Sequence, residues 1–268
     1  MVRVRGLTFA YAGQPPLFDG FDWQVGRDEA WAVIGPSGCG KSTLLYLLAG
    51  LRQPGSGQVW VGGQELLRPR PETGLILQDY GLLPWATVAE NAALGLRVRR
   101  FYGPDGRHAP REAKVEKAAI GQQVVWWLER LGIAHLRNKY PAQVSGGQRQ
   151  RTAIARTLAM QPDLLLMDEP FSSLDALTRE DLERLMLELR AETGVTTIVV
   201  THNIEEAVYL GQRLMLLRQP PHREGLLIEN PGGGQLDYRQ HPEFQARCSD
   251  VRELLGEPTV TGGKGTRA

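Results

Sequence analysis

The chain has 268 residues, of which 42% are hydrophobic, and it carries 31 Lys and Arg against 30 Asp and Glu, a formal net charge of +1. This length allows one large or two small domains with sizeable cores, so the composition excludes a tail or a fibre. The balanced charge argues against nucleic acid as a partner, because electrostatic steering usually needs a strong basic excess. Cys39 and Cys248 are too few for a disulfide framework and lack a metal-ligand spacing, which favours a reducing cytosol.

The apolar segments argue against a membrane span. Residues 1–5 alternate like a strand and lack the apolar core of a signal peptide. The most apolar stretch, residues 44–51, is far shorter than the ~20 residues that span a bilayer. We therefore expect any membrane role to depend on a partner.

The hydrophobic pattern predicts an α/β fold with a β-rich beginning. In chain order we predict antiparallel strands within 2–9 and 21–25, a strand at 31–34, a helix at 41–50, strands at 59–61 and 74–77, helices within 87–131 and at 147–159, a strand at 164–167, a helix at 175–192, a strand at 196–200, a helix at 204–210, a strand at 214–217 and a helix near 242–255. Such alternation predicts a mostly parallel sheet core, with an antiparallel β lead-in and a helical insertion.

This pattern predicts a single domain over residues 1–268. The β-rich and parallel-sheet core is expected over about 1–86 and 159–220, a helical subdomain over about 87–158, and a C-terminal extension over about 221–268. Residues 102–106 predict a turn, and residues 262–265 predict a frayed tail.

A glycine-rich turn after the strand at 31–34 matches the pattern G-x-x-x-x-G-K-[ST]. Glycines let successive backbone N–H groups surround phosphate oxygens, and the following helix N-terminus adds partial positive charge. We expect Lys41 to reach the β- and γ-phosphates and the Ser42 hydroxyl to bind Mg²⁺. An ordinary glycine turn is the alternative, but the strand before it and the helix after it favour phosphate binding. The expected nucleotide-binding residues here are Gly35, Pro36, Ser37, Gly38, Cys39, Gly40, Lys41, Ser42 and Thr43.

The apolar strand at 164–167 ends in two acids, Asp168 and Glu169, before Pro170. A carboxylate at the carboxyl end of such a strand is placed to hold Mg²⁺, so we assign Asp168 to the metal. Glu169 is then free to polarise water. Acids before a proline also occur at helix N-termini, which is the alternative interpretation.

A second glycine turn, Ser145-Gly146-Gly147-Gln148, opens the helix at 147–159. Its N–H groups and the helix dipole form another anion-seeking helix start. Two such starts more than a hundred residues apart suggest a nucleotide held from two sides. Without the other motifs, a plain N-cap with flexible glycines would be favoured.

Together these motifs make the chain resemble the ATP-binding subunit of an ABC transporter over nearly its whole length. Residues 145–148 match the signature of that family, with Val144 where Leu is usual. The resemblance implies ATP and Mg²⁺ as cofactors and hydrolysis of ATP. It also implies a head-to-tail homodimer, in which the signature of one copy closes over ATP on the phosphate loop of the other.

The resemblance assigns further roles one residue at a time. Tyr11 resembles the aromatic residue that stacks on adenine, with a core aromatic at a strand end as the alternative. Gln78 resembles the residue that contacts Mg²⁺ and the attacking water, and Asp175 resembles one that communicates across the dimer. His202 resembles the switch histidine of the γ-phosphate, followed by Asn203 where Asp is usual. The expected catalytic residues are Glu169, His202 and Gln78, and the expected metal-binding residues are Ser42, Gln78 and Asp168.

Two segments resemble bacterial importers rather than exporters. Residues 169–175 have the importer form, and residues 78–91 are similar to the nitrate, sulfonate and taurine group. The apolar cluster of Leu82, Leu83 and Trp85 is expected to be at least partly an interface to membrane permease subunits, with core packing as the alternative. The resemblance implies a solute-binding protein as an indirect partner and a peripheral location on the cytoplasmic face of the membrane.

The competing hypothesis is a soluble ABC ATPase that acts in repair, translation or cofactor assembly. The sequence contains no long heptad segment, no second cassette and no basic excess that would favour it. The basic segment 97–123 is expected to be a solvated helical face. About fifty residues follow the last predicted strand, too few for an additional regulatory β-barrel domain. The sequence does not identify the solute.

Overall fold

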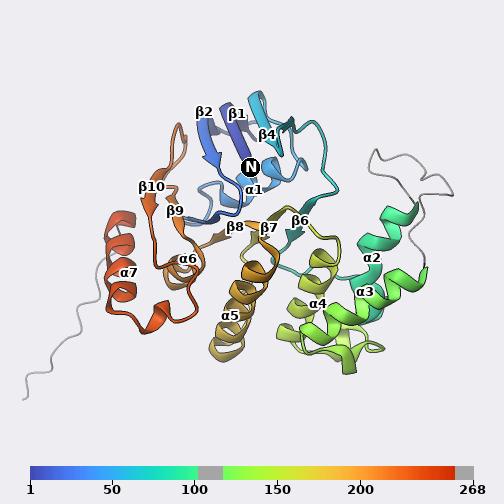
Figure 1. Cartoon of the computed structure of the whole chain (residues 1–268). Helices are drawn as coiled ribbons and strands as arrows, with labels where there is room; N and C mark the ends of the chain where they lie inside the picture. The colour runs from blue at the N-terminus through green and yellow to red at the C-terminus, as the bar shows by residue number, and fades with distance from the viewer. Residues whose placement is uncertain (102–116, 257–268) are drawn as a thin grey trace, which may run out of the picture.

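Two β-sheets organise the chain in the computed structural model, which describes residues 1–101 and 117–256 (Figure 1). The strands are β1 (Val2–Ala10), β2 (Pro16–Val25), β3 (Ala30–Ile34), β4 (Ser56–Val61), β5 (Gln64–Glu65), β6 (Thr73–Ile76), β7 (Leu164–Asp168), β8 (Thr196–Thr201), β9 (Arg213–Leu216) and β10 (Leu226–Glu229). The helices are α1 (Lys41–Leu48), α2 (Val88–Phe101), α3 (Lys117–Arg130), α4 (Gly146–Leu158), α5 (Ala176–Thr193), α6 (Ile204–Leu210) and α7 (Pro242–Leu255), with 3₁₀ helices η2 (Ala134–Leu136), η3 (Pro141–Gln143) and η4 (Tyr238–Gln240).

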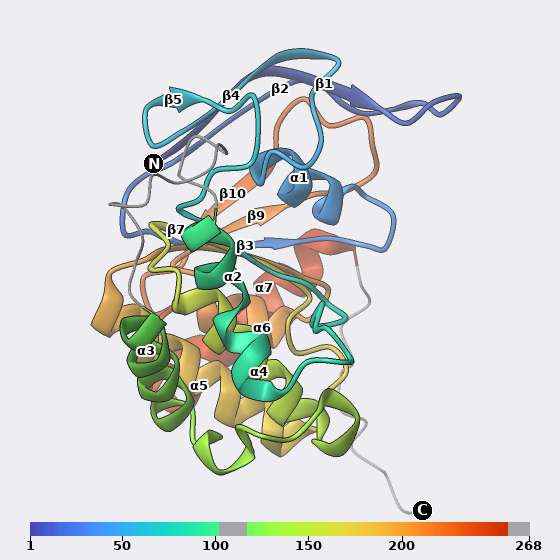
Figure 2. The ribbon, with the colours of Figure 1, turned by 90° about the vertical axis from the view of Figure 1, so that its right-hand side faces the viewer.

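The antiparallel sheet, in the order β2-β1-β4-β5, covers one side of the molecule and packs over α1 (Figure 2). Val2 pairs with Val25 of β2 and with Val61 of β4. Because side chains alternate along a strand, Val2 and Val4 point into one apolar core with α1, and a register shift between Val4 and Leu7 brings Leu7 into the same core. The predicted antiparallel lead-in is confirmed.

The second sheet has the order β10-β9-β3-β8-β7-β6. Strand β3 pairs in parallel with β8 and β9, and β7 pairs in parallel with β8 and β6. Along β3, Trp31 and Val33 belong to the core shared with α1, whereas Ala32 and Ile34 belong to the core under the helices. Burial on both faces explains why these strands are continuously apolar in the sequence.

The second sheet contains one strand that was not predicted. Strand β10 pairs antiparallel with β9, so the sheet continues to Glu229 inside the predicted C-terminal extension. Leu226 and Leu227 are 41% and 55% exposed. This short edge strand has no alternation of buried and exposed residues, and its sequence therefore gave no strand signal.

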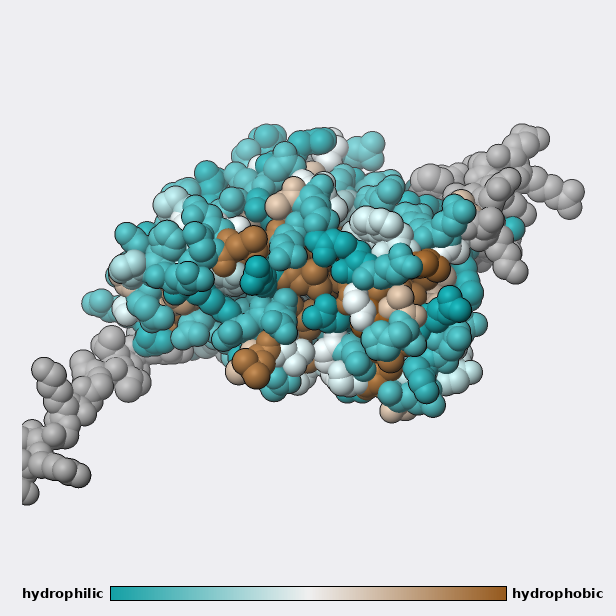
Figure 3. Space-filling model, turned by 60° about the horizontal axis from the view of Figure 1, so that its bottom comes forward, coloured by the Kyte–Doolittle hydropathy of each residue, from teal (hydrophilic) through white to brown (hydrophobic). Residues whose placement is uncertain are grey.

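Helix α1 lies between the two sheets, whereas the other helices lie on the opposite side of the parallel sheet (Figure 1). On the face seen in Figure 3, hydrophobic residues form small patches separated by polar ones. Of the described helices, none combines the length and the apolar character that crossing a membrane requires. The predicted turn at 102–106, the tail at 262–265 and part of the segment 97–123 lie outside the described residues. The subdomain boundaries stay predictions.

Candidate functional site

The phosphate loop, residues 35–42, joins β3 to α1 and requires glycine at several positions. A Cβ atom on Gly35 would lie 2.1 Å from the Leu217 carbonyl oxygen. Gly38 and Gly40 adopt φ values of 81° and 104°, which side chains other than glycine rarely tolerate. The Lys41 ammonium donates to the carbonyls of Gly35 at 2.8 Å and Pro36 at 3.1 Å, so its side chain lies along the loop.

A pocket of about 560 Å³ opens on this loop. It is lined by Tyr11, Gln14, Pro15, Pro16, Leu17, Ser37, Gly38, Gly40, Lys41, Ser42, Thr43, Glu169 and Pro220. Eight of these are predicted site residues, whereas Gln14, the two prolines after it, Leu17 and Pro220 were not predicted. The chain therefore brings β2, the phosphate loop and the end of β7 together around one cavity.

Tyr11 stands at the rim of this pocket. Its side chain is 37% exposed, so it is not the core aromatic of the alternative interpretation. The Tyr11 hydroxyl lies 3.0 Å from Thr43 Oγ1, and the guanidinium of Arg52 lies 4.9 Å from the ring centroid. Phe9 contacts the ring edge-on at 5.1 Å. Arg52 and Phe9 gave no sequence signal, because only the fold brings them to Tyr11.

Asp168, at the end of β7, is buried and receives two hydroxyl hydrogen bonds from α1. Ser42 Oγ donates to Asp168 Oδ1 at 2.8 Å, and the Tyr46 hydroxyl donates to Oδ2 at 3.0 Å. Burial, together with the hydrogen bond to this carboxylate, raises the pKa of Tyr46 to about 12. Tyr46 was not predicted as part of the site; it lies one helical turn after Ser42, on the same face of α1.

Glu169 follows Asp168 and lies close to two further predicted residues. Its Oε2 lies 3.1 Å from His202 Nδ1 and 3.4 Å from Gln78 Nε2. The three residues follow β7, β8 and β6, which are neighbours in the sheet, so their carboxyl ends meet at one edge. Glu169 has a φ of 44°, a conformation that side chains rarely adopt and that recurs at functional sites.

The signature residues lie apart from this pocket in the single chain. Ser145 caps α4: its Oγ accepts from Gln148 N at 3.3 Å, while Gln148 Oε1 accepts from Ser145 N at 2.9 Å. None of residues 145–148 lines the pocket on the phosphate loop. A Cβ on Gly147 would lie 2.4 Å from Thr178 Cγ2, so glycine allows α4 to approach α5 closely.

Asp175 caps α5 beside the signature. Its Oδ1 accepts from Thr178 N at 3.0 Å, and this hydrogen bond lowers the pKa of the Asp175 carboxyl. Asp175 therefore stays ionised at neutral pH, at the start of a helix whose dipole favours negative charge. Like the signature, it does not line the pocket of its own chain.

Tyr80 connects these separate regions and was missed by sequence reasoning. Its hydroxyl lies 2.7 Å from Ser173 Oγ, and the Arg149 guanidinium of α4 lies 5.5 Å from its ring centroid. The Arg156 side chain donates to the Tyr80 carbonyl at 2.8 Å. The only local signal is an aromatic residue two positions after Gln78, which does not reveal the contacts.

Comparison with known proteins decides the family. A family model described as ABC transporter matches residues 18–172 of the chain. The chain belongs to the ABC transporter family. The predicted α/β fold with an ATP-binding core, and the predicted ATPase coupled to transport, are thereby confirmed.

Several ABC transporter proteins are similar over most of the sequence. The taurine import ATP-binding protein TauB of Chromobacterium violaceum is 42% identical over 94% of this chain and 88% of its own length. TauB of Pseudomonas aeruginosa is 43% identical over 74% of this chain and 70% of its own length. The bicarbonate transport ATP-binding protein CmpC of Synechococcus elongatus is 40% identical over 89% of this chain, which spans 35% of CmpC. These relatives confirm the resemblance to the nitrate, sulfonate and taurine importer group.

Solved structures of ABC cassettes have the same fold. CbiO1 from Clostridium perfringens, part of the ABC transporter complex cbiONQ, gives a TM-score of 0.73 at 25% identity and covers 94% of each chain. The dimeric ATP-binding cassette MJ0796 bound to ADP and Pi gives a TM-score of 0.72 at 28% identity, covering 85% of this chain and 98% of that one. In this ABC transporter ATPase the individual roles of the site residues stay predictions.

Proposed function

We propose that the chain is the ATP-hydrolysing subunit of a bacterial importer for a small anionic solute. The observation that carries the hydrolytic part is the convergence of Glu169, His202 and Gln78 at one edge of the sheet, beside the phosphate loop. The solute class rests on the relatives, whose names specify taurine and bicarbonate. Both are small and carry an anionic group.

Hydrolysis is attack of water on the γ-phosphate, which proteins accelerate mainly by positioning and charge. Glu169 Oε2 is the acceptor that orients the water and takes its proton, since it stands at the pocket wall with His202 and Gln78 beside it. Lys41, already bonded to two loop carbonyls, carries the positive charge that the phosphates need. Tyr11 and Arg52 offer a ring and a cation at the rim where a purine base would stack.

The residues around Ser42 fit Mg²⁺ as the second cofactor. The Ser42 hydroxyl and the Asp168 carboxylate lie 2.8 Å apart and offer oxygen ligands, which this small hard cation prefers. Ser42, Asp168 and Gln78 would hold the ion together with the nucleotide phosphates. When bound, Mg²⁺ neutralises the charge that develops on the transferred phosphoryl group.

A second copy of the chain supplies the signature. Ser145, Gly147 and Asp175 lie outside the pocket of their own chain, and the α4 N-terminus is a site for an anion that another subunit brings. A head-to-tail homodimer joins each signature to the phosphate loop of its partner. The dimeric MJ0796 structures are examples of such cassettes forming dimers.

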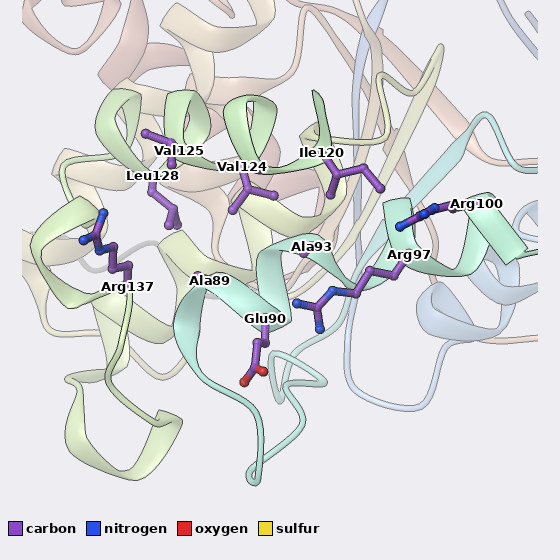
Figure 4. Close-up of a pocket in the computed structure, with 11 residues that line it drawn as sticks. Ala89, Glu90, Ala93, Arg97, Arg100, Ile120, Val124, Val125, Leu128 and Arg137 are labelled. Carbon is purple, nitrogen blue, oxygen red and sulfur yellow. The ribbon is translucent and has the colours of Figure 1, made fainter. Parts of the chain in front are cut away.

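A groove between α2 and α3 is the proposed docking site for the permease. Figure 4 shows Ile120, Val124 and Leu128 of α3 facing α2, with arginines toward both ends. The cavity measures about 670 Å³, and Arg97, Arg100 and Arg137 line it. Among described residues, these three arginines form no ion pair within 4.0 Å, so an amphipathic helix with acidic side chains complements the groove.

The loop that leads into α2 extends this surface. Trp85 is 74% exposed, and Leu82 and Leu83 are half-buried, which supports the interface interpretation for part of the cluster. Through a permease docked there the subunit is held at the cytoplasmic face of the membrane. A solute-binding protein then acts on it only indirectly.

Reconstitution tests the proposal. The chain is co-expressed with a candidate permease of the nitrate, sulfonate and taurine importer group, reconstituted in liposomes and assayed for phosphate release. We expect a solute-binding protein loaded with a sulfonate, nitrate or bicarbonate to stimulate hydrolysis several-fold over the unloaded protein. If no permease co-purifies and the loaded binding protein does not change the rate of hydrolysis, the alternative of a soluble ABC ATPase is correct instead.

A further inference from the structure

We propose that His222 is a positioning residue that holds the phosphate loop in its anion-binding shape. The inference rests on the proposed assignment of residues 35–42 to the phosphates of ATP. His222 belongs to the connection between β9 and β10, residues 217–225, which none of the sequence motifs includes.

This connection reaches across to the antiparallel sheet and is bonded to β2. The His222 N–H donates to the Leu17 carbonyl at 2.9 Å, and the Asp19 N–H donates to the His222 carbonyl at 2.9 Å. His222 and Phe18 thus form an isolated parallel bridge. These two backbone hydrogen bonds fix the position from which the His222 ring projects. The residue is only 5% exposed, so its ring lies inside the protein.

The His222 ring ends on the phosphate loop. Its Nε2 lies 2.7 Å from the carbonyl oxygen of Cys39. A carbonyl oxygen only accepts, so Nε2 carries a proton and donates. The same peptide plane contains the Gly40 N–H, which points away from the Cys39 carbonyl because the peptide is planar and trans. Holding that carbonyl therefore directs the Gly40 N–H toward the pocket that Gly40 lines.

Phe18 packs against both the His222 ring and the phosphate loop. It is fully buried, and its ring centroid lies 5.6 Å from that of the His222 ring, which restricts rotation of the imidazole. A Cβ on Gly40 would lie 3.3 Å from Phe18 Cζ. Pro220, from the same connection as His222, lines the nucleotide pocket itself. The connection between β9 and β10 is thus a built part of the nucleotide site.

Loss of the His222 donor leaves the buried Cys39 carbonyl unpaired and frees its peptide to rotate. Binding of the phosphates then weakens, because one N–H of the loop is no longer held toward them. Glu169, His202 and Gln78 follow the strands β7, β8 and β6, with which His222 shares no hydrogen bond in the described part of the chain, and they keep their geometry. The expected signature is a raised KM for ATP with little change in kcat, which a general loss of structure would not produce.

The test compares His222→Phe, which keeps a ring without a donor, with His222→Gln, whose amide donates. We expect His222→Phe to weaken binding of a fluorescent ATP analogue to the isolated chain about tenfold. In the reconstituted transporter its KM rises about tenfold while kcat stays within twofold. His222→Gln restores both to within about threefold of wild type. His135→Phe, at an exposed histidine of η2 that does not line the nucleotide pocket, is the matched control with wild-type affinity.

The Lys41→Ala variant distinguishes a failure of the proposed His222 role from a failure of the phosphate-loop assignment on which that role rests. If Lys41→Ala loses ATP and His222→Phe binds it like wild type, the role of His222 is overturned while the phosphate loop stands. If Lys41→Ala also binds ATP like wild type, the assignment of the loop fails, and the role of His222 with it. Equal losses in His222→Phe and His222→Gln overturn the hydrogen bond as the cause. His222→Leu replaces the Phe variant if that protein is insoluble.

Discussion

The Tyr80 hydroxyl and the Ser173 hydroxyl lie 2.7 Å apart. In the sequence, Tyr80 comes two residues after Gln78, and Ser173 comes two residues before Asp175. This bond links the segment that leads to Trp85 with the segment that leads to the cap of α5. The guanidinium of Arg149 lies over the Tyr80 ring, so the first turns of the signature helix share the link. When a docked permease moves the loop, these contacts transmit the movement to both segments.

Removal of that bond should weaken coupling and leave nucleotide binding intact. We expect Tyr80→Phe and Ser173→Ala each to reduce the stimulation of hydrolysis by the loaded binding protein several-fold. Because both variants break one shared bond, the double variant is no worse than either single one. ATP affinity of the isolated chain stays at the wild-type value. Tyr209→Phe, which loses a hydroxyl bond to the Leu236 carbonyl far from these loops, is the control. Additive effects would contradict the link.

Replacement of the proposed base should separate binding from hydrolysis. Glu169→Gln keeps the shape of the side chain and loses the acceptor for a proton from water. We expect it to bind ATP like wild type and to release phosphate at least 100-fold more slowly in the reconstituted transporter. Single-turnover phosphate release and filter binding measure the two steps. Normal turnover in this variant would remove Glu169 from the proposed role.

Glu206 should make stability fall with rising pH. Burial, with repulsion from Glu183, raises the pKa of Glu206 from the ordinary 4.5 to about 8. The folded state therefore binds this proton more tightly than the unfolded chain, so stability is lost as pH rises between these values. We expect the melting temperature of Glu206→Gln to change less than that of wild type between about pH 6 and pH 9. Glu205→Gln, at the exposed neighbouring position, should follow the wild-type curve.

The ion pair between Arg239 and Glu183 should anchor the C-terminal elements to α5. Glu183 is fully buried, and the Arg239 guanidinium also lies 4.3 Å from the Tyr209 ring centroid. Arg239→Met leaves a buried carboxylate without its partner, which we expect to cost about 3 kcal/mol of unfolding free energy. The double variant with Glu183→Leu should recover most of that loss. Urea denaturation measures both, and an unchanged midpoint in Arg239→Met would show that the pair does not hold this region.

Local sequence patterns predicted the elements whose starts and ends are marked by residues close in the sequence. The bounds of α6 and α7 agree with the predictions, since Asn203 and Pro242 mark their starts and glycines follow both ends. Helix α1 ends at Leu48, two residues before the predicted end, because Gly50 adopts a φ of 73°. Glu169 was assigned from the acids that end an apolar strand, whereas Gln78 and His202 were assigned through the resemblance; the fold brings all three to one edge of the sheet.

The remaining features depend on residues distant in the sequence. Tyr46 reaches Asp168 across 122 positions, and Tyr80 reaches Ser173 across 93. No periodicity encodes such contacts, because each partner is ordinary in its own segment. The edge strand β10 is visible only through its pairing with β9. The roles of the signature residues needed the resemblance to ABC transporters, since a single chain keeps them away from its own pocket.

The central position of β3 has a consequence for how the protein is made. Both of its neighbours, β8 and β9, come from the last third of the chain, and the contact from Cys39 to His222 spans 183 positions. On the ribosome, this apolar strand waits without a sheet partner until most of the protein has been synthesised. The nucleotide site, begun within the first 42 residues, is therefore among the last parts to mature. A truncated nascent chain carries the ATP motif well before it acquires an ATP site.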